Sequence, residues 1–319
     1  MPKYELKMGR ATREAFGEAI VELARENQDV VVCDADLSKS TFTHLFAKEF
    51  PNRFFECGIA EANMVAIGAG LGSAGKIPFV SSFSAFLLNK GFEQLRVTSA
   101  FPRVNLKAVG THSGISIGED GPSQMTIEDI SLACSLAGFT VIAPADEIAM
   151  KALVKLSAAV DGPFFIRAGR AKCAVIYPKD QVFEIGKAIQ LTEGNDVTIV
   201  ANGLLVAEAL RSAEALAAEG IGVRVIDMHT VKPIDRDAIA KAAAETGAIV
   251  VAEEHLVDSG LGVRVSQVVC ETSPCVMEFL GIQNTYAESG TPDDLLDKYG
   301  MRAANVTATV RKALARKKK

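Results

Sequence analysis

The sequence predicts an α/β protein built from two doubly wound domains, and three observations predict it. Short β-branched runs alternate with helical periods as far as residue 171, and the same alternation starts again after residue 192. Between them, residues 172–192 have no helical period and contain Pro178. Because strands that alternate with helices form parallel sheets, we expect domains at residues 1–171 and 193–319, joined by an extended linker.

Length and composition describe an ordinary globular protein. The 319 residues are 49% hydrophobic, which is enough for two buried cores. The net charge of -5 and the absence of Trp argue against a nucleic-acid partner. The N-terminus has no apolar signal core, and no apolar run reaches the roughly 20 residues of a membrane helix. We therefore expect a cytoplasmic protein that does not bind membranes.

The cysteines predict neither a zinc site nor a disulfide framework, because none forms a C-x-x-C pair. Several fall within apolar runs, so we interpret all six as reduced core residues. They are Cys33, Cys57, Cys134, Cys173, Cys270 and Cys275.

The chain opens with a predicted helix that has Thr12 as its N-cap and Arg13 at its exposed start. A buried strand follows at 29–33 and ends in D-A-D-L-S-K-S-T. Ligands collect at the carboxyl ends of such strands, so the polar residues of this motif are candidates for binding. They equally fit a turn that caps a helix at 42–50. These residues are Asp36, Ser38, Ser40 and Thr41.

Glu61 stands at the start of an apolar helix predicted at 61–71, after a strand ending in Phe54 and Phe55. The helix has almost no polar face, so we expect it to be buried on most sides. The helix dipole favours the carboxylate, whereas desolvation favours the neutral acid. Glu61 could therefore hold or donate a proton, although a simple capping role explains this segment equally well.

The remaining elements complete both domains. In the first, a long glycine-rich loop at 111–129 follows a strand, which is typical of functional loops. Its His112 and its acid pair, Glu119 and Asp120, could bind or exchange protons with a polar substrate; a turn with solvated acids would look the same. In the second, N-G-L at 202–204 and the segment 253–262 lack the Rossmann glycine spacing and predict turns and interface loops.

Four motifs then carry a resemblance: D-A-D-L-S-K-S-T, R-F-F-E-C-G-I-A-E-A-N-M, S-S-F-S-A-F and H-S-G-I-S-I-G-E-D-G-P-S-Q-M. Because these motifs occur in the order seen in transketolases, the chain resembles the C-terminal half of a transketolase along essentially its whole length. The resemblance implies a thiamine-diphosphate pyrimidine-binding domain, followed by a smaller transketolase C-terminal-like domain. It also implies an enzyme that transfers a two-carbon ketol unit from a ketose phosphate to an aldose phosphate.

The resemblance assigns roles to the cofactor-side residues. Glu61 becomes the catalytic carboxyl group that hydrogen-bonds the pyrimidine ring of thiamine diphosphate and promotes its activation. Phe83 and Phe86 pack on that ring, with Phe86 as the stacking partner, although plain core packing also explains Phe83. Asp36 and Leu37 belong to a cofactor-side loop near a subunit interface.

Substrate-side residues follow from the same resemblance. Arg13, Ser40, His112 and Arg170 match phosphate-binding positions, which suits arginine because its fork fits phosphate oxygens. Asp120 matches the acid that binds the C2 hydroxyl, and His112 and Gln124 join Glu61 as catalytic candidates. Gln124 departs from the histidine common in microbial transketolases, and Ala62 stands where glutamine is frequent.

The sequence lacks a G-D-G motif followed by an Asn about thirty residues later, which binds diphosphate and metal in this family. The resemblance thus implies a separate N-terminal-half subunit that supplies Mg²⁺ or Ca²⁺, within a heterotetramer. Alternatives are a 1-deoxyxylulose-5-phosphate synthase, the β subunit of a 2-oxoacid dehydrogenase, or a non-catalytic pairing subunit. Both central pentose phosphate metabolism and a dedicated catabolic route would use these residues.

Overall fold

The first sheet of the computed structural model, which describes residues 6–317, has seven strands in the order β12-β6-β7-β5-β4-β2-β3. All neighbours run parallel except β12, which pairs antiparallel with β6. The strands are β2 (Val30–Asp34), β3 (Phe54–Glu56), β4 (Ile77–Phe83), β5 (Lys107–Thr111), β6 (Thr140–Ile142), β7 (Phe164–Arg167) and β12 (Thr230–Lys232).

Helices cover both faces of this sheet because its strands are apolar on both sides. On β4, Phe79 faces a core shared with α1 and α7, while the next residue, Val80, faces a core shared with α4 and α5. The helices of this half are α1 (Thr12–Glu26), α2 (Ser38–Thr41), α3 (His44–Glu49), α4 (Glu61–Ser73), α5 (Ser84–Gln94), α6 (Asp129–Ser135) and α7 (Glu147–Ala159), with shorter turns η1 (Pro51–Arg53), η2 (Leu95–Ala100) and η3 (Ile115–Ile117).

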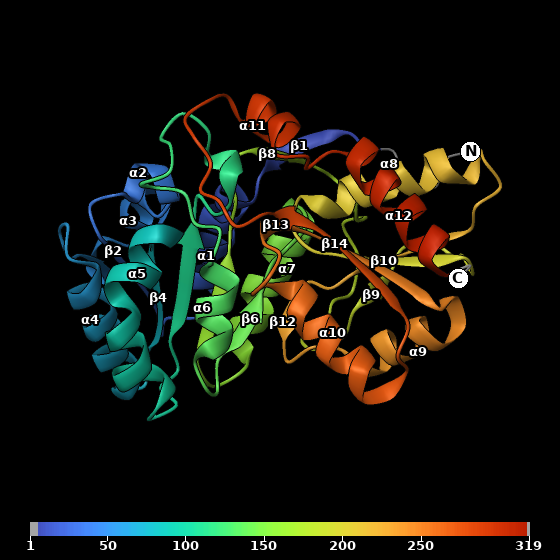
Figure 1. The fold of residues 1–319 in the computed structure, drawn as a ribbon. Coiled ribbons are helices and arrows are strands. Elements are labelled where there is room, and N and C mark those ends of the chain that lie inside the picture. The colour runs from blue at the N-terminus through green and yellow to red at the C-terminus, as the bar shows by residue number, and fades with distance from the viewer. Residues whose placement is uncertain (1–5, 318–319) are drawn as a thin grey trace.

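The second sheet has five strands in the order β14-β13-β10-β11-β9. It lies beside the first half, with helices on both of its faces (Figure 1). Its strands are β9 (Ile189–Gln190), β10 (Val197–Ala201), β11 (Val223–Asp227), β13 (Ala248–Leu256) and β14 (Val276–Ile282). Its helices are α8 (Leu205–Ala217), α9 (Arg236–Thr246), α10 (Leu261–Thr272), α11 (Pro292–Lys298) and α12 (Ala303–Lys317). Two doubly wound α/β sheets confirm the predicted fold class.

Several short elements escaped the sequence analysis. In the segment expected to be an extended linker, β8 (Lys172–Ala174) pairs with β1 (Met8–Ala11), and β9 pairs with β11. From the second half, β12 crosses over to extend the first sheet. Strands of two to four residues are too short to show a period of two, so the pattern could not reveal them.

Some helix predictions need correction. The helix expected at 42–50 is confined to α3 at His44–Glu49, because Phe42 adopts a left-handed φ of 66° where the preceding short helix α2 ends. Thr12 is the first residue of α1 rather than its cap, and its hydroxyl accepts a hydrogen bond from the Gly169 amide. Helix α4 was expected to be buried on most sides, yet Asn63, Ala66 and Gly70 are exposed.

Across residues 6–317, no helix combines the length and apolarity needed to span a membrane. The basic tail of the chain continues α12 as far as Lys317, and its last two residues lie outside the described part.

Candidate active site

An open pocket of about 490 Å³ lies where strands of the first sheet end. This is the edge at which ligands bind in open α/β sheets, and the volume suits a small molecule. Most of the predicted site residues line it, although they come from segments far apart in the chain. The predicted residues in its wall are Arg13, Leu37, Ser40, Phe83, His112, Asp120, Gln124 and Arg170, and Lys39 and Phe42 join them.

His112 is a buried, neutral imidazole. Burial, reinforced by the positive charges of Arg13 and Arg170, lowers the pKa of His112 to about 3. Nη1 of Arg13 lies 2.9 Å from Nε2 of His112, and guanidinium only donates, so Nε2 accepts. The proton therefore sits on Nδ1, which lies 2.9 Å from the Thr111 hydroxyl. That hydroxyl donates to the Ser82 carbonyl 3.2 Å away, which fixes the tautomer.

Two arginines make the pocket cationic. Arg13 also donates to the Ser40 carbonyl at 2.9 Å, and burial followed by the charge of Arg170 lowers the pKa of Arg13. Arg170 donates to the Ile117 carbonyl and pairs at 2.6 Å with Glu119, whose side chain is largely exposed. An anion bound between these two guanidinium groups would offset the repulsion between their like charges. The pocket is therefore suited to a phosphate or sulfonate group.

Glu61 begins α4 and is only 3% exposed. Its partner is Lys90 on α5, whose Nζ lies 3.3 Å from Oε1 and 3.4 Å from Oε2. The same ammonium is 4.4 Å from the centre of the Phe86 ring. Nothing in the sequence pattern predicted Lys90, because an exposed lysine within a helix carries no distinguishing signal.

Aromatic rings connect Glu61 to the cationic pocket. Phe83 is stacked on Phe86, with ring centres 5.5 Å apart and planes at 12°. On the other side, Phe83 is stacked on His112 with centres 3.7 Å apart. A row of side chains thus runs from the buried carboxylate, through Lys90 and two phenylalanines, to the histidine bound by Arg13.

The D-A-D-L-S-K-S-T motif divides into two groups. Asp36 is exposed with a left-handed φ of 61°, outside the pocket wall, whereas Leu37 and Ser40 line the pocket. Thr41 is buried instead, and its hydroxyl donates to Asp34 at 2.7 Å, so a structural role holds for this residue. Ser38 begins the short helix α2, and its carbonyl faces the His44 ring at 3.1 Å.

Asp34 is the residue of this region that the sequence analysis missed. Its carboxylate accepts from the Thr41 and Thr43 hydroxyls and from the Leu37 amide. Burial nevertheless raises the pKa of Asp34 to about 6. An aspartate at the end of a buried strand, followed by hydroxyl residues, is the signal that could have identified it.

Within residues 6–317, no three His, Cys, Asp or Glu side chains cluster in a way that could hold a metal ion. All six cysteines are free. Cys33 and Cys173 are buried as expected, but the core interpretation is wrong for Cys270, which is exposed on α10.

The fold and the pocket define a protein of two α/β units, with a cationic pocket at the strand ends of the first. Two family models match it: "Transketolase, pyrimidine binding domain" at residues 8–175 and "Transketolase, C-terminal domain" at residues 186–306. The chain belongs to the transketolase family, whose members are thiamine-diphosphate-dependent transferases that also use a divalent metal.

Relatives of two lengths match the chain. A putative transketolase C-terminal section of Methanocaldococcus jannaschii is 39% identical, covering 94% of this chain and 95% of that protein. The 6-deoxy-6-sulfo-D-fructose transketolase subunit SqwH of a Clostridium species is 37% identical, covering 96% and 95%. Human transketolase is 38% identical over 98% of this chain, which spans only 50% of the human protein.

Solved structures agree with this assignment. A structure described as "Split gene transketolase, inactive beta4 tetramer" has a TM-score of 0.91 and 47% identity, covering 97% of this chain and 100% of that one. Transketolase from Campylobacter jejuni has a TM-score of 0.84 at 23% identity, which shows the shared fold.

Proposed function

We propose that this chain is the C-terminal subunit of a split transketolase. Together with a subunit resembling the N-terminal half, it would transfer a two-carbon ketol unit from a ketose phosphate to an aldose phosphate. The row of side chains from Glu61 to Arg13 carries the proposal, because it joins a buried carboxylate to a cationic pocket through aromatic faces. Matches along nearly the full length of two separate subunits support the split arrangement.

The residues around Glu61 fit an aminopyrimidine ring. The carboxylate already receives hydrogen bonds from an ammonium group that lies over the Phe86 ring. A flat ring that carries nitrogen donors and acceptors satisfies the same carboxyl group and aromatic face. Glu61, Phe83, Phe86, Asp36 and Leu37 would hold it. When bound, thiamine diphosphate supplies the nucleophilic carbon that cleaves the ketose and carries the two-carbon unit.

The chain's own residues would then bind and orient the sugar phosphate. Arg13 and Arg170 bind the phosphate with Ser40, and Asp120 accepts from the C2 hydroxyl. Because Nε2 of His112 accepts from Arg13, the histidine first orients that arginine. Gln124 lines the same pocket, and its neutral amide would donate and accept hydrogen bonds. Because an amide does not titrate, any proton transfer at this position would need another group.

The proposal extends to assembly and setting. The partner subunit would bind the diphosphate through Mg²⁺ or Ca²⁺, in a heterotetramer with two interfacial sites. Residues 1–171 would form the pyrimidine-binding domain, 172–192 the connection and 193–319 the C-terminal-like domain. We further propose a cytoplasmic enzyme of carbohydrate metabolism, in the pentose phosphate pathway or a dedicated catabolic route.

The test is co-expression with the N-terminal-half subunit, followed by an assay of ketol transfer from xylulose 5-phosphate to ribose 5-phosphate. Activity that requires both chains, thiamine diphosphate and Mg²⁺ is the expected result. Decarboxylation of pyruvate without ketol transfer would instead support a synthase or dehydrogenase. A Glu61→Ala complex with unchanged activity would show that this chain only pairs with its partner.

A sulfonated donor is a second candidate. The chain is 37% identical to a subunit named for 6-deoxy-6-sulfo-D-fructose, over 95% of that subunit. A sulfonate is an anion with three oxygens, so the Arg13 and Arg170 pair would suit it as well. The same complex should therefore be assayed with this donor, and the ratio of kcat/KM values decides between the two.

A further inference from the structure

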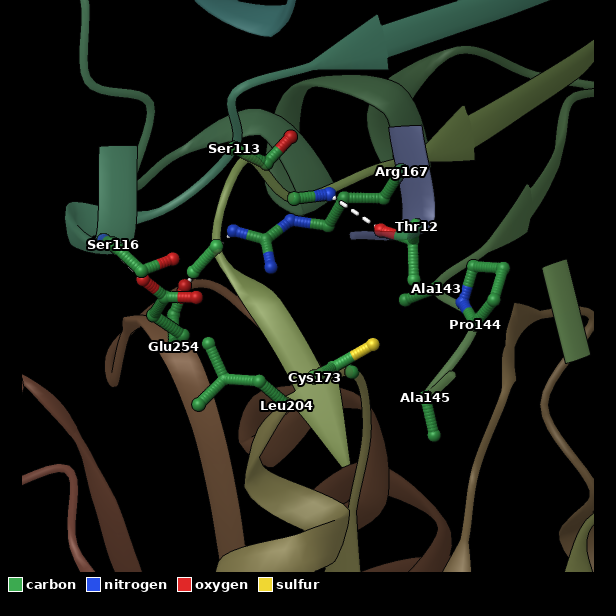
Figure 2. A pocket seen from close by; sticks show the side chains of 13 residues that line it. Thr12, Ser113, Ser116, Ala143, Pro144, Ala145, Arg167, Cys173, Leu204 and Glu254 are labelled. Carbon is green, nitrogen blue, oxygen red and sulfur yellow. Dashed lines mark hydrogen bonds between the residues drawn. The ribbon is translucent and has the colours of Figure 1, made fainter. Parts of the chain in front are cut away.

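The second α/β unit supports the loop that carries His112 and Asp120. Buried Arg167, on β7 of the first unit, donates through Nε to Asp129 at 2.7 Å and through Nη2 to the Glu254 carbonyl at 2.9 Å. Glu254 belongs to β13 of the second unit, and its side chain lies directly beneath the loop, as Figure 2 shows. Glu254 therefore reaches the first unit from the second one.

The Glu254 carboxylate contacts the loop backbone at two residues. Its Oε1 accepts from the Ser116 amide at 2.6 Å. At Gly114, a Cβ would lie only 2.2 Å from the Glu254 carboxyl carbon, and the backbone has a left-handed φ of 82°. Only glycine fits such a position, because any side chain at Gly114 would overlap the Glu254 carboxylate.

Other parts of the second unit contact the same loop. A Cβ at Gly118 would lie 2.9 Å from the Pro292 ring at the start of α11, and one at Gly121 would lie 2.4 Å from the Ser289 hydroxyl. Figure 1 shows α11 above this part of the first unit. Among these contacts, Glu254 is the one whose side chain accepts a hydrogen bond from a buried backbone amide.

The supported loop has a strained residue within the candidate site. His112 adopts a left-handed φ of 60°, which non-glycine residues hold only where neighbouring contacts fix it. The residues that follow it are held by backbone hydrogen bonds from Ser113 to Ala168 and from Gly114 to Thr126. The hydrogen bond from the Ser116 amide to Glu254 holds the next part of the loop, beside the Ile117 carbonyl that accepts from Arg170.

Glu254 acts through this loop and does not touch the substrate. The cavity beside it is lined by Thr12, Ser113, Ser116, Arg167, Cys173 and Leu204, among others (Figure 2). It encloses about 30 Å³, which is room for a water molecule but not for a sugar phosphate. We propose that Glu254 is a positioning residue, by which the second unit holds His112 and Arg170 in place for substrate. The kinetic part of this proposal rests on the proposed function, and the structural part does not.

The structural part is tested by hydrogen exchange on the chain, with Glu254→Ala, Glu254→Gln and Glu254→Asp variants. Loss of the acceptor should speed exchange of the amides at 113–118 at least tenfold in the alanine variant. Glutamine keeps an acceptor oxygen and should restore protection. The matched control is Glu253→Ala, since Glu253 accepts from the Leu261 and Gly262 amides of α10. The Glu253→Ala variant should speed amide exchange at the start of α10 and leave the amides at 113–118 protected.

The kinetic part is tested on the complex with the N-terminal-half subunit. We expect Glu254→Ala to raise KM for the phosphorylated donor by roughly tenfold to a hundredfold, with a smaller change in kcat. Glu254→Gln should stay within a few fold of the wild type. If the alanine variant does not fold, Glu254→Asp, which withdraws the acceptor by one methylene, serves in its place.

The outcomes are separable. Unchanged amide exchange at 113–118 in both the alanine and aspartate variants would overturn the positioning role, whatever the kinetic result. Faster exchange with equal losses of kcat in the alanine and glutamine variants would also overturn it, because a positioning residue is rescued by its isostere. An inactive wild-type complex would count against the proposed function alone, while the exchange result would still decide the role of Glu254.

Discussion

The Lys90 ammonium lies 3.3 Å from the buried carboxylate of Glu61 and 4.4 Å from the centre of the Phe86 ring. It therefore occupies the space between the carboxyl group and the aromatic face that we assign to the pyrimidine. The Lys90 side chain is 52% exposed, so its flexible stem can move out toward solvent.

Replacing Lys90 tests whether this lysine competes with the cofactor. We expect Lys90→Met to strengthen binding of thiamine diphosphate by the assembled complex several-fold, because no ion pair must be broken first. The unfolding free energy of the chain should fall by about 1 kcal/mol, since the lysine of the pair is half exposed to solvent. Isothermal titration calorimetry gives the affinity, and Lys155→Met, which removes the exposed pair with Glu26, is the control. Weaker cofactor binding in Lys90→Met would mean that Lys90 helps to hold the cofactor.

Arg13→Lys should weaken the use of phosphorylated substrates. Lysine keeps the charge but loses the planar fork and the bond to His112, so KM for the phosphorylated donor should rise roughly tenfold or more. The control is Arg25→Lys on the same helix, where the arginine pairs with Glu49 at the surface. If both variants lose the same affinity, the effect lies in the stability of α1 rather than in phosphate binding.

His112 should remain neutral throughout the working range of the enzyme. Its pKa is about 3 in the folded chain and near 6.5 when unfolded, so the unfolded chain binds the proton more readily. The stability that neutral His112 contributes is therefore present above pH 6.5 and is lost as pH falls toward 3. Nitrogen chemical shifts of labelled His112 should show no titration between pH 5 and 8. Protonation near pH 6.5 would contradict the buried tautomer described above.

Asp227 should make stability fall with rising pH. Burial raises the pKa of Asp227 to about 8, and the Tyr177 hydroxyl donates to its Oδ2 at 2.6 Å. The folded chain thus binds a proton that the unfolded chain releases near pH 4. Its contribution to stability is lost as pH rises from about 4 through 8, with a slope of at most about 1.4 kcal/mol per pH unit. Asp227→Asn should flatten the plot of unfolding free energy, measured by urea, against pH between about 4 and 8. An unchanged plot would mean that another group causes the pH dependence.

Local pattern was sufficient for the main framework. The buried run D-V-V-V-C, which contains most of β2, and the strand I-P-F-V-S-S-F were predicted because their apolar character is continuous along the chain. The helix that begins at Glu61 and the glycine-rich loop after β5 were predicted for similar reasons. The family resemblance also indicated the residues Arg13, His112, Asp120 and Arg170, which the structure brings into one pocket. The assignment to the transketolase family could thus be anticipated from the sequence.

Contacts between distant residues were decided only by tertiary structure. Arg13 and His112 are 99 positions apart, and Ser116 and Glu254 are 138 apart. Lys90 reaches Glu61 across 29 positions, and β12 leaves its own half to pair with β6. Short-range periodicity records which face of an element is apolar, but not which distant side chain meets it. The sequence by itself therefore determined the longer strands and helices, the family and most of the candidate residues. Packing decided the neutral state of His112, the lysine beside Glu61 and the support that Glu254 gives to the loop.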